Sequence, residues 1–244
     1  MANEEQFLKI QEFLDGLKGE INVLDEQIDI DVQIEYFEAS REAKKELDPA
    51  FILADRDKIF SLELDHEQKK ILLLQLASIE SVEAYRAIEQ FKSKPDDGLK
   101  DWAALALQES RMILESHFLE QSQLFISTGM GGRANKLRYF VVFLLKSDFE
   151  LDDLRKKIIK NELEFFLKKE TAELESISFE SAYVSIKVLL PLQTRIQECF
   201  DEILVSCNQF GDFLSDNYII TNVKELSNEE IIELLNSENT QENK

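Results

Sequence analysis

Apolar residues recur at helical spacing through most of the N-terminal half of the chain. Residues 4–18 carry the first stripe, which is typical of an amphipathic helix ending near a glycine: Phe7, Leu8, Ile10, Phe13, Leu14 and Leu17. Three residues stand where a side chain caps a helix N-terminus: Asp48, Asp65 and Ser81. A proline follows Asp48, at the first helical position. Gln68 stands three residues after Asp65, as in a capping box. This half is therefore predicted to be helical.

The apolar period changes in the C-terminal half. Residues 139–145 are apolar on both faces, which is typical of a central strand covered on both sides. Residues 183–190 alternate between apolar and polar, as a half-buried strand does. A helix is expected after Asp152, with these residues facing inward: Leu154, Ile158, Leu163 and Phe166. The order over 138–223 is strand, helix, strand, strand, helix, strand, as in a ferredoxin-like split βαβ unit.

One helical stretch has a family resemblance. The turn Ser93-Lys94-Pro95-Asp96-Asp97-Gly98 leads into Leu99-Lys100-Asp101-Trp102-Ala103-Ala104-Leu105-Ala106-Leu107. Together with the helix pair before it, this run over residues 65–118 resembles a HEAT or armadillo-type helical repeat, about one and a half units long. A solenoid needs about three repeats to bury a continuous core. The resemblance implies a non-catalytic scaffold that holds other macromolecules.

We therefore expect a helix-dominated α+β protein with two domains. Residues 1–118 are predicted to form an acidic, HEAT-like helical domain, and residues 119–226 a small ferredoxin-like α+β domain. Residues 227–244 are predicted to hold a short helix and a disordered acidic tail. Fold alone indicates no function.

The charge balance narrows the class of partner. The chain has 49 acidic residues against 28 Lys and Arg, a formal net charge of −21, so general nucleic-acid binding is disfavoured. The N-terminal residues lack the basic start and apolar stretch of a signal peptide, and no apolar run is long enough to span a bilayer. We expect a cytoplasmic protein without membrane insertion.

The first candidate site is a window without acids. No Asp or Glu occurs between Glu120 and Asp148, and a glycine-rich, cationic run lies inside this window. Glycine lets backbone N–H groups surround an anion, and Lys or Arg adds charge. The run lacks the Gly-Lys-Ser/Thr ending of a phosphate-binding loop, so an ordinary hairpin loop between two strands, 124–128 and 138–145, is the alternative. The residues predicted to bind an anion or a partner are Thr128, Gly129, Gly131, Gly132, Arg133, Asn135, Lys136 and Arg138.

Other candidate chemistry is sparse. His66, at a helix start, is expected to be solvated, and His117 is expected to cap a helix end. Cys199 and Cys207 lie on the apolar stripe of a helix expected over 192–210, and we expect them to be core residues. No spacing among Cys and His suits zinc, so we predict no catalytic residue, no metal and no cofactor.

These observations favour a non-enzymatic, cytoplasmic scaffold protein. It would bind another macromolecule, more readily a protein than a nucleic acid, through its helical surface and the cationic loop. One alternative is an enzyme that binds a nucleotide or phosphometabolite with the loop at residues 128–138. A second alternative is a factor that associates with the ribosome or another structured RNA. The sequence leaves open whether the protein is an enzyme, but it favours a non-enzymatic protein.

Overall fold

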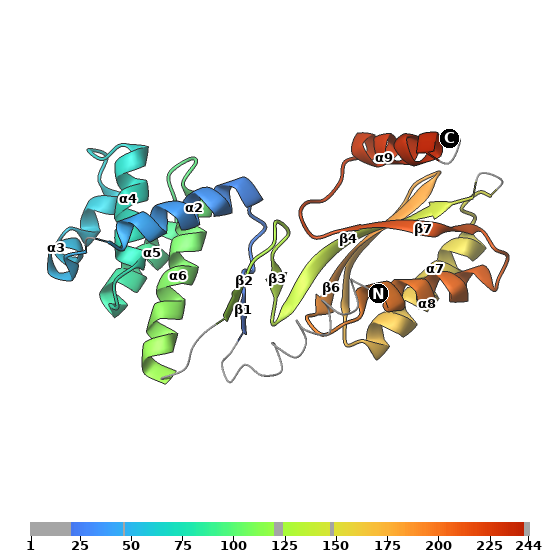
Figure 1. Cartoon of the computed structure of the whole chain (residues 1–244), viewed down its shortest axis with the longest axis horizontal. Helices are drawn as coiled ribbons and strands as arrows, with labels where there is room; N and C mark the ends of the chain where they lie inside the picture. The colour runs from blue at the N-terminus through green and yellow to red at the C-terminus, as the bar shows by residue number, and fades with distance from the viewer. Residues whose placement is uncertain (1–20, 46, 120–123, 147–148, 242–244) are drawn as a thin grey trace. The chain divides into compact units, whose positions relative to one another are not determined.

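The chain folds as an α+β protein with two compact units, Met1–Ser127 (unit 1) and Thr128–Lys244 (unit 2) (Figure 1). The structure, a computed structural model, describes residues 21–45, 47–119, 124–146 and 149–241. The predicted helix at 4–18 lies outside the described residues. The α+β class predicted from the sequence is confirmed. None of the helices in the described part of the chain is long and apolar enough to cross a membrane.

Unit 1 consists mainly of helices. Its elements are β1 (Ile21–Val23), α2 (Ile30–Ala43), α3 (Pro49–Ala54), the 3-10 helix η1 (Arg56–Phe60), α4 (His66–Ala77), α5 (Val82–Ser93), α6 (Lys100–Leu119) and β2 (Leu124–Ile126). The predicted caps are confirmed: Asp48 accepts from the Phe51 N–H, and Ser81 accepts from the Ala84 N–H. Asp65 and Gln68 form the predicted capping box at the start of α4.

The helices of unit 1 pack as one cluster. The helix α4 contacts α2, α3, η1, α5 and α6, and α6 in turn contacts α2 and α5. They share one core, in which Trp102 of α6 meets the buried Tyr36 of α2, with ring centroids 5.2 Å apart. In a repeat stack, by contrast, each helix pair contacts only its neighbours. The described part of unit 1 does not show the HEAT-like domain predicted for it.

Unit 1 also contains a short parallel pair of strands. β1 pairs with β2, and Asn22 stands opposite Phe125. The sequence predicts residues 124–128 as one of the two strands that flank the glycine run in a hairpin. That prediction is wrong, because β2 pairs with β1 and not with the strand that follows the glycines. Its partner lies about a hundred residues away in the sequence, beyond the reach of a local pattern.

Unit 2 contains an antiparallel sheet with helices on both faces. Its elements are β3 (Gly132–Arg133), β4 (Lys136–Leu145), α7 (Asp153–Lys169), β5 (Glu173–Phe179), β6 (Tyr183–Pro191), α8 (Ile196–Asn208), β7 (Leu214–Thr221) and α9 (Asn228–Gln241). The strands lie side by side in the order β5-β6-β4-β7, and the two-residue β3 pairs with the start of β4. The element order from β4 to β7 is the one that the sequence predicts.

The central strand β4 is covered on both faces. Val141 and Phe143 belong to the core that contains buried residues of α7 and α8. Phe140 and Val142 belong to a second core with Ile231 of α9. Figure 1 shows α7 and α8 on one side of the sheet and α9 on the other. Each face of the sheet thus has its own helical cover, as the apolar run at 139–145 predicts.

Two helices of unit 2 differ from their predicted form. The inward residues of α7 are Ile159, Leu163 and Leu167, whereas Leu154 is 66% exposed. The predicted inward set is therefore wrong for Leu154, because the helix has apolar residues on most of its circumference and its sequence does not say which of them meets the sheet. The helix α9 reaches Gln241, so it extends into the region predicted as a disordered tail.

Candidate functional site

The glycine run forms a small hairpin with its own turn. β3 and β4 are joined by Ala134 and Asn135, whose φ angles are 49° and 63°. Two consecutive residues with positive φ form the kind of tight turn that matches the twist of a two-stranded ribbon. Both are exposed at the tip, whereas Gly131 and Gly132 before them are buried.

Several backbone N–H groups of this run are engaged within the protein. The Met130 N–H donates to the Asn222 carbonyl at 3.0 Å, and the Gly131 N–H donates to the Thr128 carbonyl at 3.1 Å. The Arg138 N–H donates to the Gly131 carbonyl at 3.0 Å. An anion-binding loop instead directs its N–H groups at the ligand. The backbone hydrogen bonds of this run thus stabilise the hairpin.

The three cations of the run face two acids of β5. Arg133 and Lys136 donate to the two carboxylate oxygens of Glu173, each at 2.6 Å. Arg138 donates through two nitrogens to Glu175, with Nη2 at 2.9 Å from Oε1. Lys136 and then Arg133 hold the pKa of Glu173 below its usual range, and Arg138 does the same for Glu175. Acids 37 to 40 residues away thus balance the charge of the acid-free window, and anion or partner binding by this run stays a prediction.

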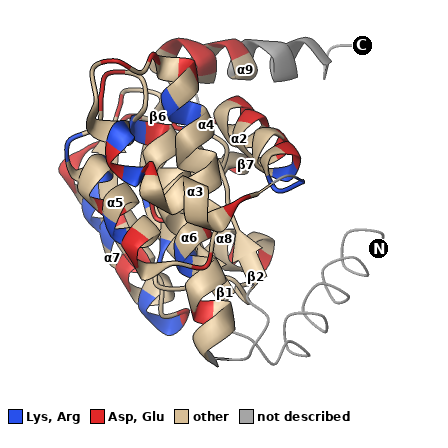
Figure 2. Cartoon of the chain, turned by 90° about the vertical axis from the view of Figure 1, so that its left-hand side faces the viewer, with Lys and Arg blue, Asp and Glu red and all other residues tan. Residues whose placement is uncertain are grey.

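The helix α7 is cationic and its cations are less engaged. It carries six Lys and Arg against three Asp and Glu. Arg155 pairs with Asp152, and Lys169 pairs with Glu202 of α8. Among the described cations of unit 2, those without an ion pair to a described residue all lie on α7: Lys156, Lys157, Lys160 and Lys168. Figure 2 draws the Lys and Arg of this helix in blue.

Aromatic and apolar side chains accompany these lysines. The ammonium groups of Lys156 and Lys160 lie 6.0 and 5.7 Å from the ring centroid of Phe179, at the end of β5. Phe165 and Leu154 are 65% and 66% exposed. At 100° per residue, both fall on the side of the helix that bears Lys157 and Lys168. We call Leu154, Lys157, Lys160, Phe165 and Lys168 the outer face of α7.

The outer face is not among the sites predicted from the sequence, although the sequence contains its signal. Four Lys and Arg occur within six residues, from Arg155 to Lys160. Lys157 and Lys168 are eleven residues apart, or about 16 Å along a helix. One acid, Glu164, lies on the same side and is exposed. The outer face can therefore offer several ammonium groups and a phenyl ring to one extended anionic ligand.

The remaining titratable candidates are placed elsewhere. Nδ1 of His117 lies 2.9 Å from a carboxylate oxygen of Glu80, in unit 1. His66 is the first residue of α4 and is exposed. Cys199 and Cys207 are buried in the core of unit 2, as predicted, and burial raises their pKa values to about 11 and about 12. The described residues include no group of three or more His, Cys, Asp and Glu that could hold a metal ion.

Comparisons with known proteins found similarity only at the level of structure. No family model matches the sequence, and no curated protein matches it. A protein of Deinococcus radiodurans that is assigned as a transposase aligns with 43% of this chain and 93% of its own, at 16% identity and a TM-score of 0.37. A REP-associated tyrosine transposase bound to a REP hairpin aligns with 38% of this chain and 59% of its own, at 8% identity and a TM-score of 0.33.

Several predictions need correction. Neither similar structure is named as a helical-repeat protein. The HEAT-type resemblance for residues 65–118 is wrong, because the described helices of unit 1 share one core and do not stack as successive pairs. The prediction of a non-enzymatic scaffold for protein–protein interaction was what that resemblance implied, so it is wrong as well. Neither similar structure is named as one of the two alternatives, an enzyme for a nucleotide or phosphometabolite and a ribosome-associated factor.

Proposed function

We propose that unit 2 binds DNA through the outer face of α7. The observation that carries the proposal is the set of four lysines that make no ion pair with a described residue and that all lie on this helix. We also infer that unit 2 is a ferredoxin-like domain, supported by its element order and the strand order β5-β6-β4-β7. We choose DNA as the first ligand to test because the similar structures are named as transposases, and the proposal itself rests on α7.

The chemistry of the outer face suits a nucleic-acid backbone. Lysine ammonium groups bind phosphates and release the counterions condensed on them, which gives affinity without sequence preference. An exposed ring such as Phe165 offers a surface on which a base can stack. Leu154 and Phe165 are largely exposed beside lysines that make no ion pair with a described residue. The outer face can therefore make ionic contacts with phosphates and apolar contacts with bases.

The negative net charge of the protein does not prevent this contact. Unit 2 has 21 Asp and Glu against 14 Lys and Arg, so it is less acidic than the rest of the chain. At physiological salt the screening length is about 8 Å, so distant acids are largely screened while a lysine in contact with a phosphate is not. The local sign of α7 therefore decides whether a phosphate binds there.

The test compares two double charge reversals in the full chain. Lys157→Glu with Lys168→Glu changes the outer face of α7, and Lys94→Glu with Lys100→Glu changes two exposed lysines of unit 1 by the same total charge. Binding of a fluorescent DNA hairpin and of a DNA single strand is measured by anisotropy at several salt concentrations. We expect the α7 variant to lose about tenfold or more in affinity and to flatten the log–log salt slope by about 1.4 to 1.8.

Two results would refute the proposal. If both double variants weaken binding equally, only the net charge matters. If the wild-type protein binds neither DNA, unit 2 does not have this function. Reversal of Arg133 and Lys136 to Glu separates the glycine run from α7: because Glu173 already pairs with both, we expect affinity to change by less than about twofold.

A further inference from the structure

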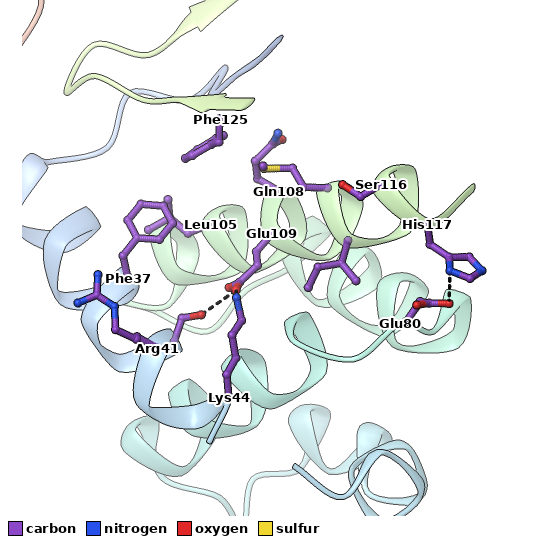
Figure 3. A pocket seen from close by; sticks show the side chains of 13 residues that line it. Phe37, Arg41, Lys44, Glu80, Leu105, Gln108, Glu109, Ser116, His117 and Phe125 are labelled. Carbon is purple, nitrogen blue, oxygen red and sulfur yellow. Dashed lines mark hydrogen bonds and ion pairs between the residues drawn. The ribbon is translucent and has the colours of Figure 1, made fainter. Parts of the chain in front are cut away.

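Unit 1 contains a groove that its described residues leave open. The groove has a volume of about 820 Å³ and runs along one side of α6, between α2 and β2 (Figure 3). Its apolar wall is formed by Phe37, Leu105, Met112, Ile113 and Phe125. The rings of Phe37 and Phe125 meet edge to face with centroids 5.8 Å apart, which closes one end of the wall.

The groove is the second apolar side of α6. Its first side is in the core of unit 1, where Trp102, Ala103 and Ala106 are buried. Residues 105, 109, 112 and 116 follow the spacing of a helical stripe, and Met112 and Ile113 on it are only half-buried. A stripe of this kind, bordered by a second helix, is the shape that receives the apolar side of another helix.

Most of the charged side chains that line the groove are paired. Glu109 accepts from the Tyr36 hydroxyl at 2.6 Å and from the Ser40 hydroxyl at 2.7 Å, and it pairs with Lys44 (Figure 3). Among the lining residues Arg41 makes no ion pair with a described residue. An occupant that complements the groove should therefore turn an apolar stripe toward its wall and keep its charged side chains outside it.

We propose that the N-terminal segment of this chain, residues 4–18, occupies the groove. Its sequence has the required character, with an apolar stripe and acids on the other side: Glu4, Glu5, Glu12 and Asp15. The described chain begins at Ile21 of β1, which pairs with β2, and β2 supplies Phe125 to the groove wall. The Asn22 amide also donates to Glu115 of α6 at 3.4 Å.

The short connection makes the chain's own segment the favoured occupant. Only two residues lie between position 18 and Ile21, and a tether of that length holds a segment at an effective concentration in the millimolar range. Any external helix must compete with a ligand at this concentration. The groove of α6 is thus an intramolecular docking surface for the apolar side of the segment.

Disulfide trapping in the full chain tests this placement. Leu14→Cys on the apolar stripe and Glu12→Cys on the opposite side are each combined with Met112→Cys in the groove. Cys199 and Cys207 are buried and do not compete. Under mild oxidation we expect an intramolecular bond in the Leu14→Cys variant, identified by peptide mass, and at least about fivefold less bond with Glu12→Cys, because only one side of a helix faces its partner.

A second measurement does not depend on a bond. Ile10→Asp with Leu14→Asp should open the groove and raise the fluorescence of an apolar-surface dye severalfold, whereas Glu12→Gln should leave it at the wild-type level. The fluorescence of Trp102 reports whether unit 1 is still folded. Equal trapping at positions 12 and 14, bonds formed only between two chains, or no change in dye binding with unit 1 folded would each overturn the proposal.

Discussion

Replacing Tyr36 by phenylalanine removes a single hydroxyl from the core of unit 1. Tyr36 is fully buried, and its hydroxyl donates to Glu109 at 2.6 Å. A hydrogen bond to a charged acceptor contributes about 1.5 to 3 kcal/mol to stability. The ring and its packing on Trp102 are kept, and Glu109 retains Ser40 and Lys44. We therefore expect Tyr36→Phe to lower the free energy of unfolding of unit 1 by about 2 kcal/mol.

The assay is urea denaturation followed by tryptophan fluorescence. Trp102 is the one tryptophan of the chain and lies in unit 1, 5.2 Å from the ring of Tyr36, so its signal reports this unit. Tyr85→Phe is the matched control, because the Tyr85 hydroxyl lies near the surface, in a long contact of 3.5 Å with Glu89 and beside Arg111. Its cost should stay within about 0.5 kcal/mol. Equal costs for the two variants would refute the reasoning.

The same contact has a pH signature. Burial first, and then the charge of Glu109, raises the pKa of Tyr36 well above the ordinary tyrosine value of 10.0. The unfolded chain releases this proton near pH 10 and the folded chain retains it, so stability is lost as the pH rises above 10. The decrease attributable to Tyr36 is about 1.4 kcal/mol per pH unit. Tyr36→Phe lacks this component, and identical pH slopes for wild type and variant would contradict the assignment.

Two further predictions concern unit 2. Burial raises the pKa values of Cys199 and Cys207 to about 11 and about 12. At pH 8 a thiol reagent should therefore modify neither cysteine in the folded protein and both after unfolding. Rapid reaction of the folded protein would contradict their burial. The Asn208 side chain both donates to and accepts from the backbone of Leu214, at 2.9 Å each. Asn208→Ala should therefore lower the free energy of unfolding, followed by circular dichroism, by about 1 to 3 kcal/mol. The same substitution at the exposed Asn217 should leave it almost unchanged.

The sequence predicted those features that depend on a few neighbouring residues. Asp48, Asp65 and Ser81 cap helices as expected, because a cap joins groups only two or three residues apart. The element order of unit 2 was also predictable, since each strand and helix of it has its own apolar period. The apolar run at 139–145 indicated a strand covered on both faces, and β4 indeed has a core on each face.

The features that the sequence did not predict depend on distant residues. Glu173 and Glu175 neutralise the glycine run from β5, and no local pattern places β5 beside it. β2 pairs with β1, which precedes it by about a hundred residues. The inward side of α7 depends on how the sheet meets a helix with apolar residues on most of its circumference.

A solvated helix can also expose unpaired lysines, so the distribution of pairing has to be compared across the chain. In unit 1, cations without an ion pair to a described residue are scattered over different elements, among them Arg41 on α2, Arg86 on α5 and Lys100 on α6. Among the cations that the structure describes in unit 2 they are confined to α7, although acids outnumber cations in this unit as well. Random solvation predicts scatter in both units. Confinement to one helix, beside an exposed Phe165, is what a shared anionic ligand predicts, and it makes the paired reversal of Lys157 and Lys168 the decisive measurement.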